Sequence, residues 1–279
     1  MKIGMSALSP MTGELSRFIF THKVLGKYDA DYCFDPKCGY IFVHSPFWLK
    51  EAYESAIAVL DTGLLARNIK NIDVITKSIV QDSLNCSRGI DLGGGLGVFV
   101  RGMRDAGFDF YWTDKYAENV LARGFEGEIA DYDIAVAFEV LEHIPNPIKF
   151  LTDARARYNF STCFFSATCF SEDAIPSSDW WYWVFETGQH IGFFSLRSLQ
   201  WMAKELEMDL YHVDDDIYAF STRPISLQQP RSLTLWGRAV WKLRRKLGIS
   251  DLSARASLTM SDHILLRDRL RKEQATVQR

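Results

Sequence analysis

The chain has 279 residues, of which 47% are hydrophobic and 24% are charged, and its net charge is −3. This is the composition of a soluble globular protein, so it excludes a disordered chain, a collagen and a long coiled coil. No stretch reaches the roughly 18 consecutive apolar residues that a membrane-spanning helix needs.

The amino-terminal residues and the cysteines indicate the compartment. Residues 1–12 contain one lysine and lack the apolar segment of a secretion signal. Five cysteines form an odd, scattered set in a chain too large to depend on disulfides, which favours a reducing environment. We therefore expect a cytoplasmic protein.

Residues 1–75 are expected to form an amino-terminal extension to the main domain. Short aromatic and β-branched runs predict strands at 18–20 and 40–43. The spacing of apolar residues predicts a helix over 48–65.

Residues 76–225 are expected to form the main domain, because strands and helices alternate along them. Apolar runs predict strands at 88–92, 108–113, 134–138, 162–167, 210–213 and 218–221. Helices are predicted over 98–106, over 147–158 and over 196–206; Pro147 suits a first helical turn, and Ser195 can cap the last helix. This alternation is typical of an α/β fold with a largely parallel sheet.

Residues 226–279 are expected to form a basic helical tail. From residue 228 onward the chain has 12 Lys and Arg against 4 Asp and Glu. Between 231 and 247, apolar residues including two tryptophans can line one helical face while basic residues occupy much of the remainder. Such a helix suits peripheral contact with the inner face of an anionic membrane. Docking on the main domain or on a second copy of the chain is the alternative.

The sharpest motif is the glycine-rich loop DLGGGLG at 91–97, between a predicted strand and a predicted helix. A dinucleotide fingerprint would need a glycine where Val98 stands. A phosphate-binding loop of the Walker type would need a Lys-Ser or Lys-Thr pair after the glycines. Both ligand classes are excluded at this loop, and what remains is an acidic residue followed by G-x-G-x-G.

This loop resembles the first motif of the class I S-adenosylmethionine-dependent methyltransferases. A second likeness to that family is YDIAVAFEVLEH at 132–143, where the family has a strand followed by E-V-L-E-H. Blocks at 48–53 and 188–195 resemble a branch that often accompanies sugar and polysaccharide biosynthesis. The resemblance implies a Rossmann-like methyltransferase fold with helices on both faces of the sheet. Only 19 residues, 115–133, precede the next predicted strand, so the family's third strand must be abridged.

The resemblance also implies where S-adenosylmethionine binds. Asp114 follows the second strand of the domain, where a carboxylate can accept both hydroxyls of a ribose. Glu139 is expected beside the methionine moiety and Glu126 near the adenine. The expected cofactor contacts are Asp91, Gly93, Gly94, Gly95, Gly97, Asp114, Lys115, Glu126, Phe138 and Glu139.

Two histidines are the candidates for acceptor chemistry. His143 follows the second motif, and His190 lies in a Gly-Gln-His turn. A sugar hydroxyl is a poor nucleophile at neutral pH, so its methylation calls for a general base or a metal ion. The resemblance to the saccharide-associated branch implies O-methylation of a saccharide or a saccharide-derived metabolite, and we expect His143 and His190 to be the catalytic residues. The aromatic cluster Trp180, Trp181 and Tyr182 is expected to contact the acceptor.

Glu139, Glu142, His143 and His190 allow a second interpretation. They match an E-x-x-E-H arrangement, with a later histidine, that holds a divalent ion in some quinone and RNA O-methyltransferases. A metal-dependent methyltransferase of a quinone or small phenol is the alternative within the class. A non-catalytic, cofactor-binding scaffold in a glycan-assembly complex is the alternative outside it. Nucleic acid is a weaker partner, since the body of the chain is acidic and carries no recognition motif.

Cys33 and Cys38 have the spacing of half of a zinc knuckle. In the resembled branch a C-P-x-C-G run precedes such a pair, whereas this chain has Ser-Pro-Met-Thr-Gly at 9–13, with hydroxyls in place of thiolates. Structural zinc takes four Cys or His ligands. We therefore expect a knuckle-shaped remnant held by packing, without zinc.

Overall fold

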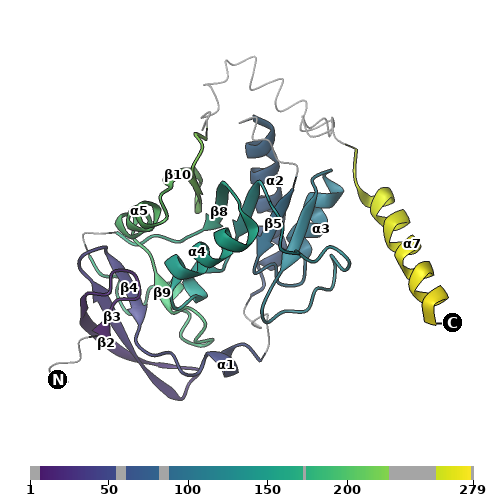
Figure 1. Ribbon diagram of the computed structural model, residues 1–279. Coiled ribbons are helices and arrows are strands. Elements are labelled where there is room, and N and C mark those ends of the chain that lie inside the picture. The colour runs from purple at the N-terminus through teal and green to yellow at the C-terminus, as the bar shows by residue number, and fades with distance from the viewer. Residues whose placement is uncertain (1–6, 55–60, 82–87, 172–173, 226–255, 278–279) are drawn as a thin grey trace, which may run out of the picture.

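The computed structural model describes residues 7–54, 61–81, 88–171, 174–225 and 256–277. Its centre is a six-stranded sheet in the order β10-β11-β8-β7-β5-β6 (Figure 1). Strands β6, β5, β7 and β8 are parallel, and β11 and β10 extend the sheet as an antiparallel pair. The strands are β5 (Gly89–Leu92), β6 (Phe110–Thr113), β7 (Ile134–Ala137), β8 (Thr162–Ser166), β10 (Asp209–Asp214) and β11 (Ile217–Ser221).

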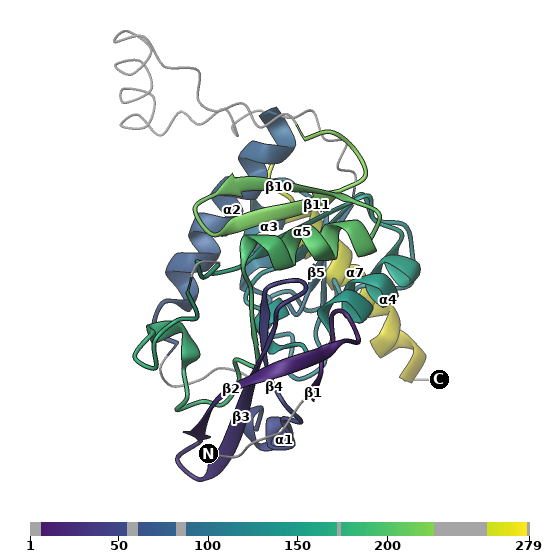
Figure 2. The same cartoon turned by 90° about the vertical axis from the view of Figure 1, so that its left-hand side faces the viewer.

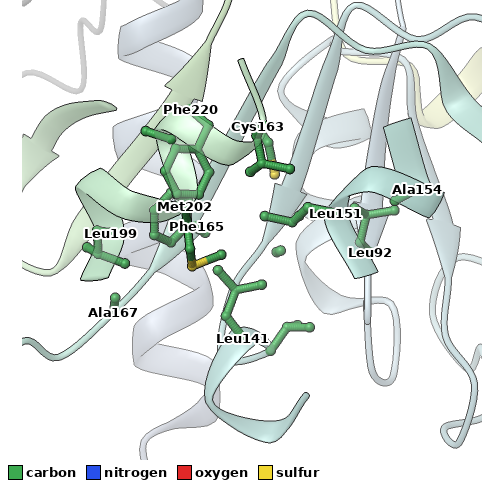
Figure 3. Close-up of a cluster of buried hydrophobic side chains, with 14 of the residues drawn as sticks. Leu92, Leu141, Leu151, Ala154, Cys163, Phe165, Ala167, Leu199, Met202 and Phe220 are labelled. Carbon is green, nitrogen blue, oxygen red and sulfur yellow. The ribbon is translucent and has the colours of Figure 1, made fainter. Parts of the chain in front are cut away.

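Helices cover both faces of this sheet because its central strands are apolar on both sides. Val136 and Phe164 pack with residues of α2 and α3, whereas Cys163 and Phe165 pack with residues of α4 and α5 (Figure 3). Alternate residues of a strand point to opposite faces, so one continuous apolar run supplies both cores. The helices are α2 (Leu64–Gln81), α3 (Val98–Asp105), α4 (Pro147–Tyr158) and α5 (Leu196–Glu205).

The elements predicted for the main domain are confirmed, each to within two residues at either end. The expected caps are present. The Asn146 side chain accepts the backbone N–H of Lys149 at 2.9 Å, with Pro147 in the first turn of α4. Ser195 and Ser198 exchange hydrogen bonds in a capping box at the start of α5. The largely parallel α/β fold is therefore the one that local patterns predicted.

The third strand is abridged, as the short spacing before β7 predicted. Residues 115–133 contain neither a helix nor a strand, and a single parallel bridge joins Glu126 to Trp112 of β6. The backbone N–H of Trp112 donates to the Phe125 carbonyl at 2.8 Å, and the N–H of Gly127 donates to the Trp112 carbonyl at 2.6 Å. This segment therefore closes the edge of the sheet with two backbone hydrogen bonds.

The carboxyl-terminal helix α7 (Thr259–Val277) lies beside this edge and α3 (Figure 1). Asp262 accepts two hydrogen bonds from the Arg104 guanidinium at 2.8 Å each and a third from Arg101 at 2.9 Å. Further along the helix, Arg269 donates to the Gly124 carbonyl at 3.0 Å. The end of the basic tail is thus anchored to the main domain by ion pairs.

A second sheet of five antiparallel strands lies beside the central one, on the side away from α7 (Figures 1 and 2). Its fifth strand comes from the main domain, because β9 pairs with β4 through Ile41–Phe193 and Phe42–Gly192. The amino-terminal extension is therefore joined to the domain by a shared sheet. The strands are β1 (Ala7–Leu8), β2 (Leu15–Val24), β3 (Tyr28–Asp35), β4 (Tyr40–Val43) and β9 (Gly192–Phe193).

The single helix predicted over 48–65 is wrong. The structure has a short helix α1 (Leu49–Ala52), and α2 begins at Leu64 and runs through residue 75, where the domain edge was expected. Residues 55–60 lie outside the described part of the chain. Ile75 and Ile79 of α2 enter the core at helical spacing. The sequence gives only a weak helix signal over residues 64–81, because this segment is rich in β-branched residues, which lower helix propensity.

No described helix is long and apolar enough to cross a membrane. The amphipathic stretch expected at 231–247 lies outside the described residues, so membrane contact and docking both stay predictions.

The knuckle remnant is organised around the buried carboxylate of Asp35. Its Oδ2 accepts hydrogen bonds from Thr12 Oγ1 at 2.7 Å and from Cys38 Sγ at 3.3 Å. Burial alone would raise the pKa of Asp35, but these bonds and one from Ser9 hold it below the ordinary value. Cys33 lies on β3, and burial raises the pKa of its thiol to about 11. The two hydroxyls that stand where the resembled branch has thiolates thus bond a carboxylate.

Replacing Thr12 with valine is expected to lower the free energy of unfolding by about 1.5 kcal/mol, because a buried carboxylate loses a charge-assisted hydrogen bond. Thr21→Val is the matched control, since Thr21 makes the same kind of bond to Asp31 on the exposed part of the hairpin. Urea unfolding of both variants checks this. Equal losses would show that the bond to Asp35 has no special weight.

Candidate active site

The carboxyl ends of the parallel strands open into a pocket of about 1160 Å³. Gly93, Asp114 and Glu139 line it, and they follow β5, β6 and β7 in turn. In the sheet, β5 lies between β6 and β7, so the chain order reverses at this point. Open α/β sheets bind ligands in the crevice at such a reversal.

The glycine loop takes backbone conformations that other residues avoid. Gly93, Gly95 and Gly97 have φ of 82°, 52° and 83°. A Cβ on Gly93 would lie 2.7 Å from Val140 Cγ2, and one on Gly97 would lie 2.8 Å from Asn119 Oδ1. A Cβ on Gly95 would meet nothing within 4 Å. Gly93 and Gly97 are therefore required by packing, whereas Gly95 borders open space in the pocket.

Asp114 ties the glycine loop to the end of β6. Its Oδ2 accepts the Gly95 N–H at 3.0 Å, and its Oδ1 accepts the N–H groups of Tyr116 and Ala117 at 2.7 and 2.8 Å. A carboxylate has about four lone-pair positions, so hydrogen-bonding capacity remains for a ligand. The loop and Asp114 thus form one preorganised unit.

Asp91 lies at the end of β5 and is only 3% exposed. Burial, assisted by the nearby charge of Asp114, raises the pKa of Asp91 to about 8. The unliganded protein therefore holds a neutral carboxyl group here at neutral pH.

In Asp91→Asn, the free energy of unfolding is expected to fall less steeply with rising pH than it does in the wild type. A carboxyl whose pKa rises on folding keeps a proton that the unfolded chain releases, so the free energy of unfolding falls as pH rises from about 4 to about 8. Asparagine has no such proton. Between pH 5 and 8, the wild type should lose about 3–4 kcal/mol more than the variant in urea unfolding. Asp131→Asn, at an exposed position, is the control, and parallel curves for wild type and Asp91→Asn would contradict the prediction.

Glu139 follows β7 with a φ of 54°, which is unusual for a residue other than glycine. Ser166 Oγ accepts its backbone N–H at 2.7 Å and donates to its Oε1 at 2.9 Å. Its Oε2 lies 3.5 Å from Arg67 Nε on α2. Burial and the nearby Glu142 raise the pKa of Glu139 to about 7, against the opposing charge of Arg67.

Glu142, His143 and His190 come together beside the pocket, which His143 and His190 line, although 46 residues separate the first two from the third. One ligand atom of each side chain lies within 4.8 Å of the others. Glu142 is 1% exposed, and one of its oxygens accepts the Tyr182 hydroxyl at 2.9 Å. Burial lowers the pKa of both histidines to about 4, so both are neutral at pH 7.

The expected metal set therefore needs correction, because Glu139 is not part of this cluster. Its carboxylate is bonded to Ser166 and faces Arg67. The positive φ of Glu139 directs its side chain differently from a residue on a regular helix, on which the E-x-x-E-H spacing argument relied.

The expected cofactor contacts fall into two groups. Asp91, Gly93, Gly94, Gly95, Asp114, Lys115, Phe138 and Glu139 line the pocket, whereas Gly97 and Glu126 are not among its lining residues. Glu126 instead bonds the Asn119 amide and the Gly124 N–H, and so fixes the loop beside β6. Gly97 lets α3 begin close to that loop. We assign both a structural role.

The expected acceptor contacts are also divided. Trp181 is 71% exposed and lines the pocket together with Tyr182. Trp180 instead packs against Trp183 and Phe193 beside the small sheet. The segment forms a 3-10 turn, η2 (Trp181–Trp183), which replaces the strict alternation that an extended strand would give.

Among the lining residues that the sequence did not identify are Arg67, Tyr53 and Tyr116. Arg67 comes from α2, and Tyr53 stacks on Tyr116 with ring centroids 4.7 Å apart. The likeness at 48–53 included Tyr53 without suggesting a role for it. Arg67 and Tyr116 carry no motif, and only the packing of α2 and of the loop after β6 brings them here.

Comparison with known proteins agrees with this architecture. A family model described as a methyltransferase domain matches residues 59–213. Among solved structures, the chain is similar to magnesium protoporphyrin IX methyltransferase from Synechocystis PCC 6803 with bound SAH (12% identity, 62% of this chain and 92% of that one, TM-score 0.41). It is also similar to PigF with SAH (14% identity, 62% and 61%, TM-score 0.45) and to an O-methyltransferase family protein from Burkholderia thailandensis (13%, 62% and 66%, TM-score 0.37). No curated protein sequence matches the chain.

Proposed function

The chain belongs to the methyltransferase-domain family, and from this we propose that it uses S-adenosylmethionine to methylate a hydroxyl group of a saccharide or a saccharide-derived metabolite. One observation carries the proposal. A single pocket joins the glycine loop and Asp114 at one end to His143 and His190 at the other. Cofactor and acceptor can therefore meet in one pocket.

The cofactor end supports S-adenosylmethionine. The open space at Gly95 admits the cofactor, and the remaining lone-pair position of Asp114 accepts a ribose hydroxyl. Lys115, Phe138 and Glu139 also line the pocket, and we assign Glu139 to the methionine moiety. These residues bind and orient the cofactor, which supplies the reactive methyl group itself.

The acceptor end supports methylation of oxygen. The hydroxyl oxygen forms the new bond to the methyl carbon, and the carbon–sulfur bond breaks with its electron pair moving to sulfur. The hydroxyl must lose its proton in the process, and His143 and His190, which line the pocket, are the candidate general bases. The exposed face of Trp181 suits the apolar face of a sugar ring.

A quinone or other small phenol is the second candidate acceptor. The stacked rings of Tyr53 and Tyr116 at the pocket favour it, because aromatic walls suit a planar ring. A saccharide hydroxyl is less acidic than a phenol and needs stronger activation. Removal of the histidines should therefore reduce methylation of a saccharide more than methylation of a phenol.

Methyl transfer from labelled S-adenosylmethionine to panels of nucleotide sugars and small phenols tests the proposal, with mass spectrometry of the products. His190→Ala is expected to reduce turnover at least tenfold with little change in cofactor affinity. His212→Ala is the control, since His212 is exposed on β10. Failure to bind S-adenosylmethionine would overturn the proposal. Binding without methylation of any acceptor would favour the non-catalytic scaffold.

A further inference from the structure

The edge segment, residues 119–127, lies along the outer side of β6 and supports the glycine loop, although it contains no helix or strand. Within it, the N–H groups of Val120 and Leu121 donate to the Leu96 carbonyl at 3.2 and 3.0 Å. Leu96 belongs to the glycine loop and lines the pocket. The position of the edge segment therefore helps to set the backbone of the loop that borders the cofactor end.

Trp112 of β6 makes a second connection between the edge segment and the glycine loop. Its indole Nε1 donates to the Gly95 carbonyl at 2.8 Å. Its backbone bonds the edge segment through the Phe125 carbonyl and the Gly127 N–H. A displacement of the edge segment would therefore disturb two successive carbonyl groups of the loop, those of Gly95 and Leu96.

Helix α7 contacts the edge segment at Gly124. Arg269 donates to the Gly124 carbonyl at 3.0 Å, and the Leu266 side chain occupies the space that a Cβ on Gly124 would need. Gly124 has a φ of 86°, which glycine adopts readily and other residues avoid. The Glu126 carboxylate accepts the Gly124 N–H at 3.0 Å and the Asn119 amide at 2.7 Å. Hydrogen bonds thus connect the contact with α7 to the start of the edge segment.

The buried ion pair between α7 and α3 also supports the edge segment. Asp262 holds the Arg104 guanidinium, whose central carbon lies 3.7 Å from the centroid of the Phe125 ring. A cation over an aromatic face is attracted to it, and more strongly where water is excluded. Phe125 is buried. Through Arg104, Asp262 therefore helps to fix the residue whose carbonyl pairs with β6.

Among the described residues of α7, none lines the pocket, so the helix acts on the cofactor end through the edge segment. We propose that Asp262 and Arg269 are positioning residues that hold the glycine loop in the conformation that binds the cofactor. The edge segment has only two backbone hydrogen bonds to β6, and α7 supplies the contacts that a full strand pair would otherwise provide.

The match to the methyltransferase-domain model ends at residue 213, so this role belongs to a part of the chain outside the matched domain. The identity of the cofactor rests on the proposed function. The coupling between α7 and the glycine loop does not, and it can be measured without any ligand.

Hydrogen exchange of the α7 amides tests the coupling in the wild type. If docked α7 favours the binding conformation, bound cofactor must favour docked α7 by the same factor. With saturating S-adenosylmethionine, the α7 amides should exchange about tenfold more slowly than without it. A helix that only stabilises the fold would open locally at the same rate in both conditions.

Isothermal titration of full-length variants measures the effect in the other direction. Asp262→Ala should weaken S-adenosylmethionine binding about tenfold, and Arg269→Met, which keeps the buried ion pair, about threefold. Arg269→Lys retains a donor for the Gly124 carbonyl and should restore most of the affinity. Arg271→Met is the matched control on the same helix, because the Arg271 side chain is 68% exposed and lies 4.0 Å from Asp268. Its affinity should equal that of the wild type.

Two results would overturn the proposal: wild-type affinity in Asp262→Ala when exchange shows that α7 has detached, or exchange of α7 in the wild type that ignores the cofactor. Exchange without cofactor separates these from a failure of the proposed function. The Val120 and Leu121 amides should exchange faster in Asp262→Ala than in Asp268→Ala, relative to the amides of β3. If they do, and S-adenosylmethionine binds no form of the protein, the proposed function falls and the coupling stands. If they do not, the coupling falls.

Discussion

Replacing Gly95 with aspartate is expected to weaken S-adenosylmethionine binding at least 100-fold, which is about 2.7 kcal/mol. The Gly95 position borders open space in the pocket, so a side chain there would occupy volume that the cofactor needs. The residue has a φ of 52° and donates its N–H to Asp114, so the loop has little freedom to move the new side chain aside. Isothermal titration with S-adenosylmethionine and S-adenosylhomocysteine measures the effect.

Gly26→Asp is the matched control for this substitution. Gly26 has a φ of 70° in the turn between β2 and β3, and a Cβ there also meets nothing within 4 Å. The Gly26→Asp variant therefore has a similar backbone strain at a site outside the pocket. Its affinity for the cofactor should equal that of the wild type. Gly95→Asn adds a side chain of similar volume without a charge. If volume causes the loss of cofactor affinity, this variant should lose as much affinity as Gly95→Asp. Wild-type affinity in Gly95→Asp would show that the cofactor does not occupy this space.

Removing Asp262 is expected to release α7 from the domain and to lower the free energy of unfolding by about 3 kcal/mol. The side chains of Asp262 and Arg104 are each 5% exposed and form a paired hydrogen bond. Deleting one partner of a buried ion pair leaves the other charge inadequately compensated. Urea unfolding of Asp262→Ala gives the energy, and hydrogen exchange of the α7 amides shows whether the helix detaches.

Asp268→Ala provides the control on the same helix. Asp268 is about half exposed, and its nearest basic groups lie 3.8–4.0 Å away. Such surface pairs contribute about 0–1 kcal/mol, so stability and exchange should change little. If the α7 amides of Asp262→Ala stay as protected as those of the wild type, the ion pair does not anchor the helix.

Most of the main-domain fold could be predicted because its signals are local. The apolar run at 134–138, Pro147 with Asn146, and Ser195 each specify an element through neighbouring residues. The helix α2 could not be placed in this way, since isoleucines at helical spacing also suit strands. The docking of α7 depends on Arg104 and Asp262, which lie 158 residues apart.

The candidate site likewise has one part that local sequence patterns predict and one part that depends on long-range contacts. The glycine loop and Asp114 belong to one local strand–loop–helix–strand pattern, and their proximity follows from the order of the strands. The pairing of His143 with His190, and the bond from Tyr182 to Glu142, depend on a long excursion between β8 and β9. The sequence indicated the residue types there, but the positive φ of Glu139, which removes it from the cluster, has no local signal.

The sharing of β9 between the two sheets has a consequence for how such an enzyme can change its substrate. The glycine loop, Asp114 and Glu139 lie within residues 89–139, whereas His190 lies two residues before β9, whose partner β4 belongs to the amino-terminal extension. Substitutions in the small sheet can therefore shift His190 while the glycine loop and Asp114 stay in place. Such substitutions, natural or engineered, could change the acceptor that is methylated while the methyl donor stays the same.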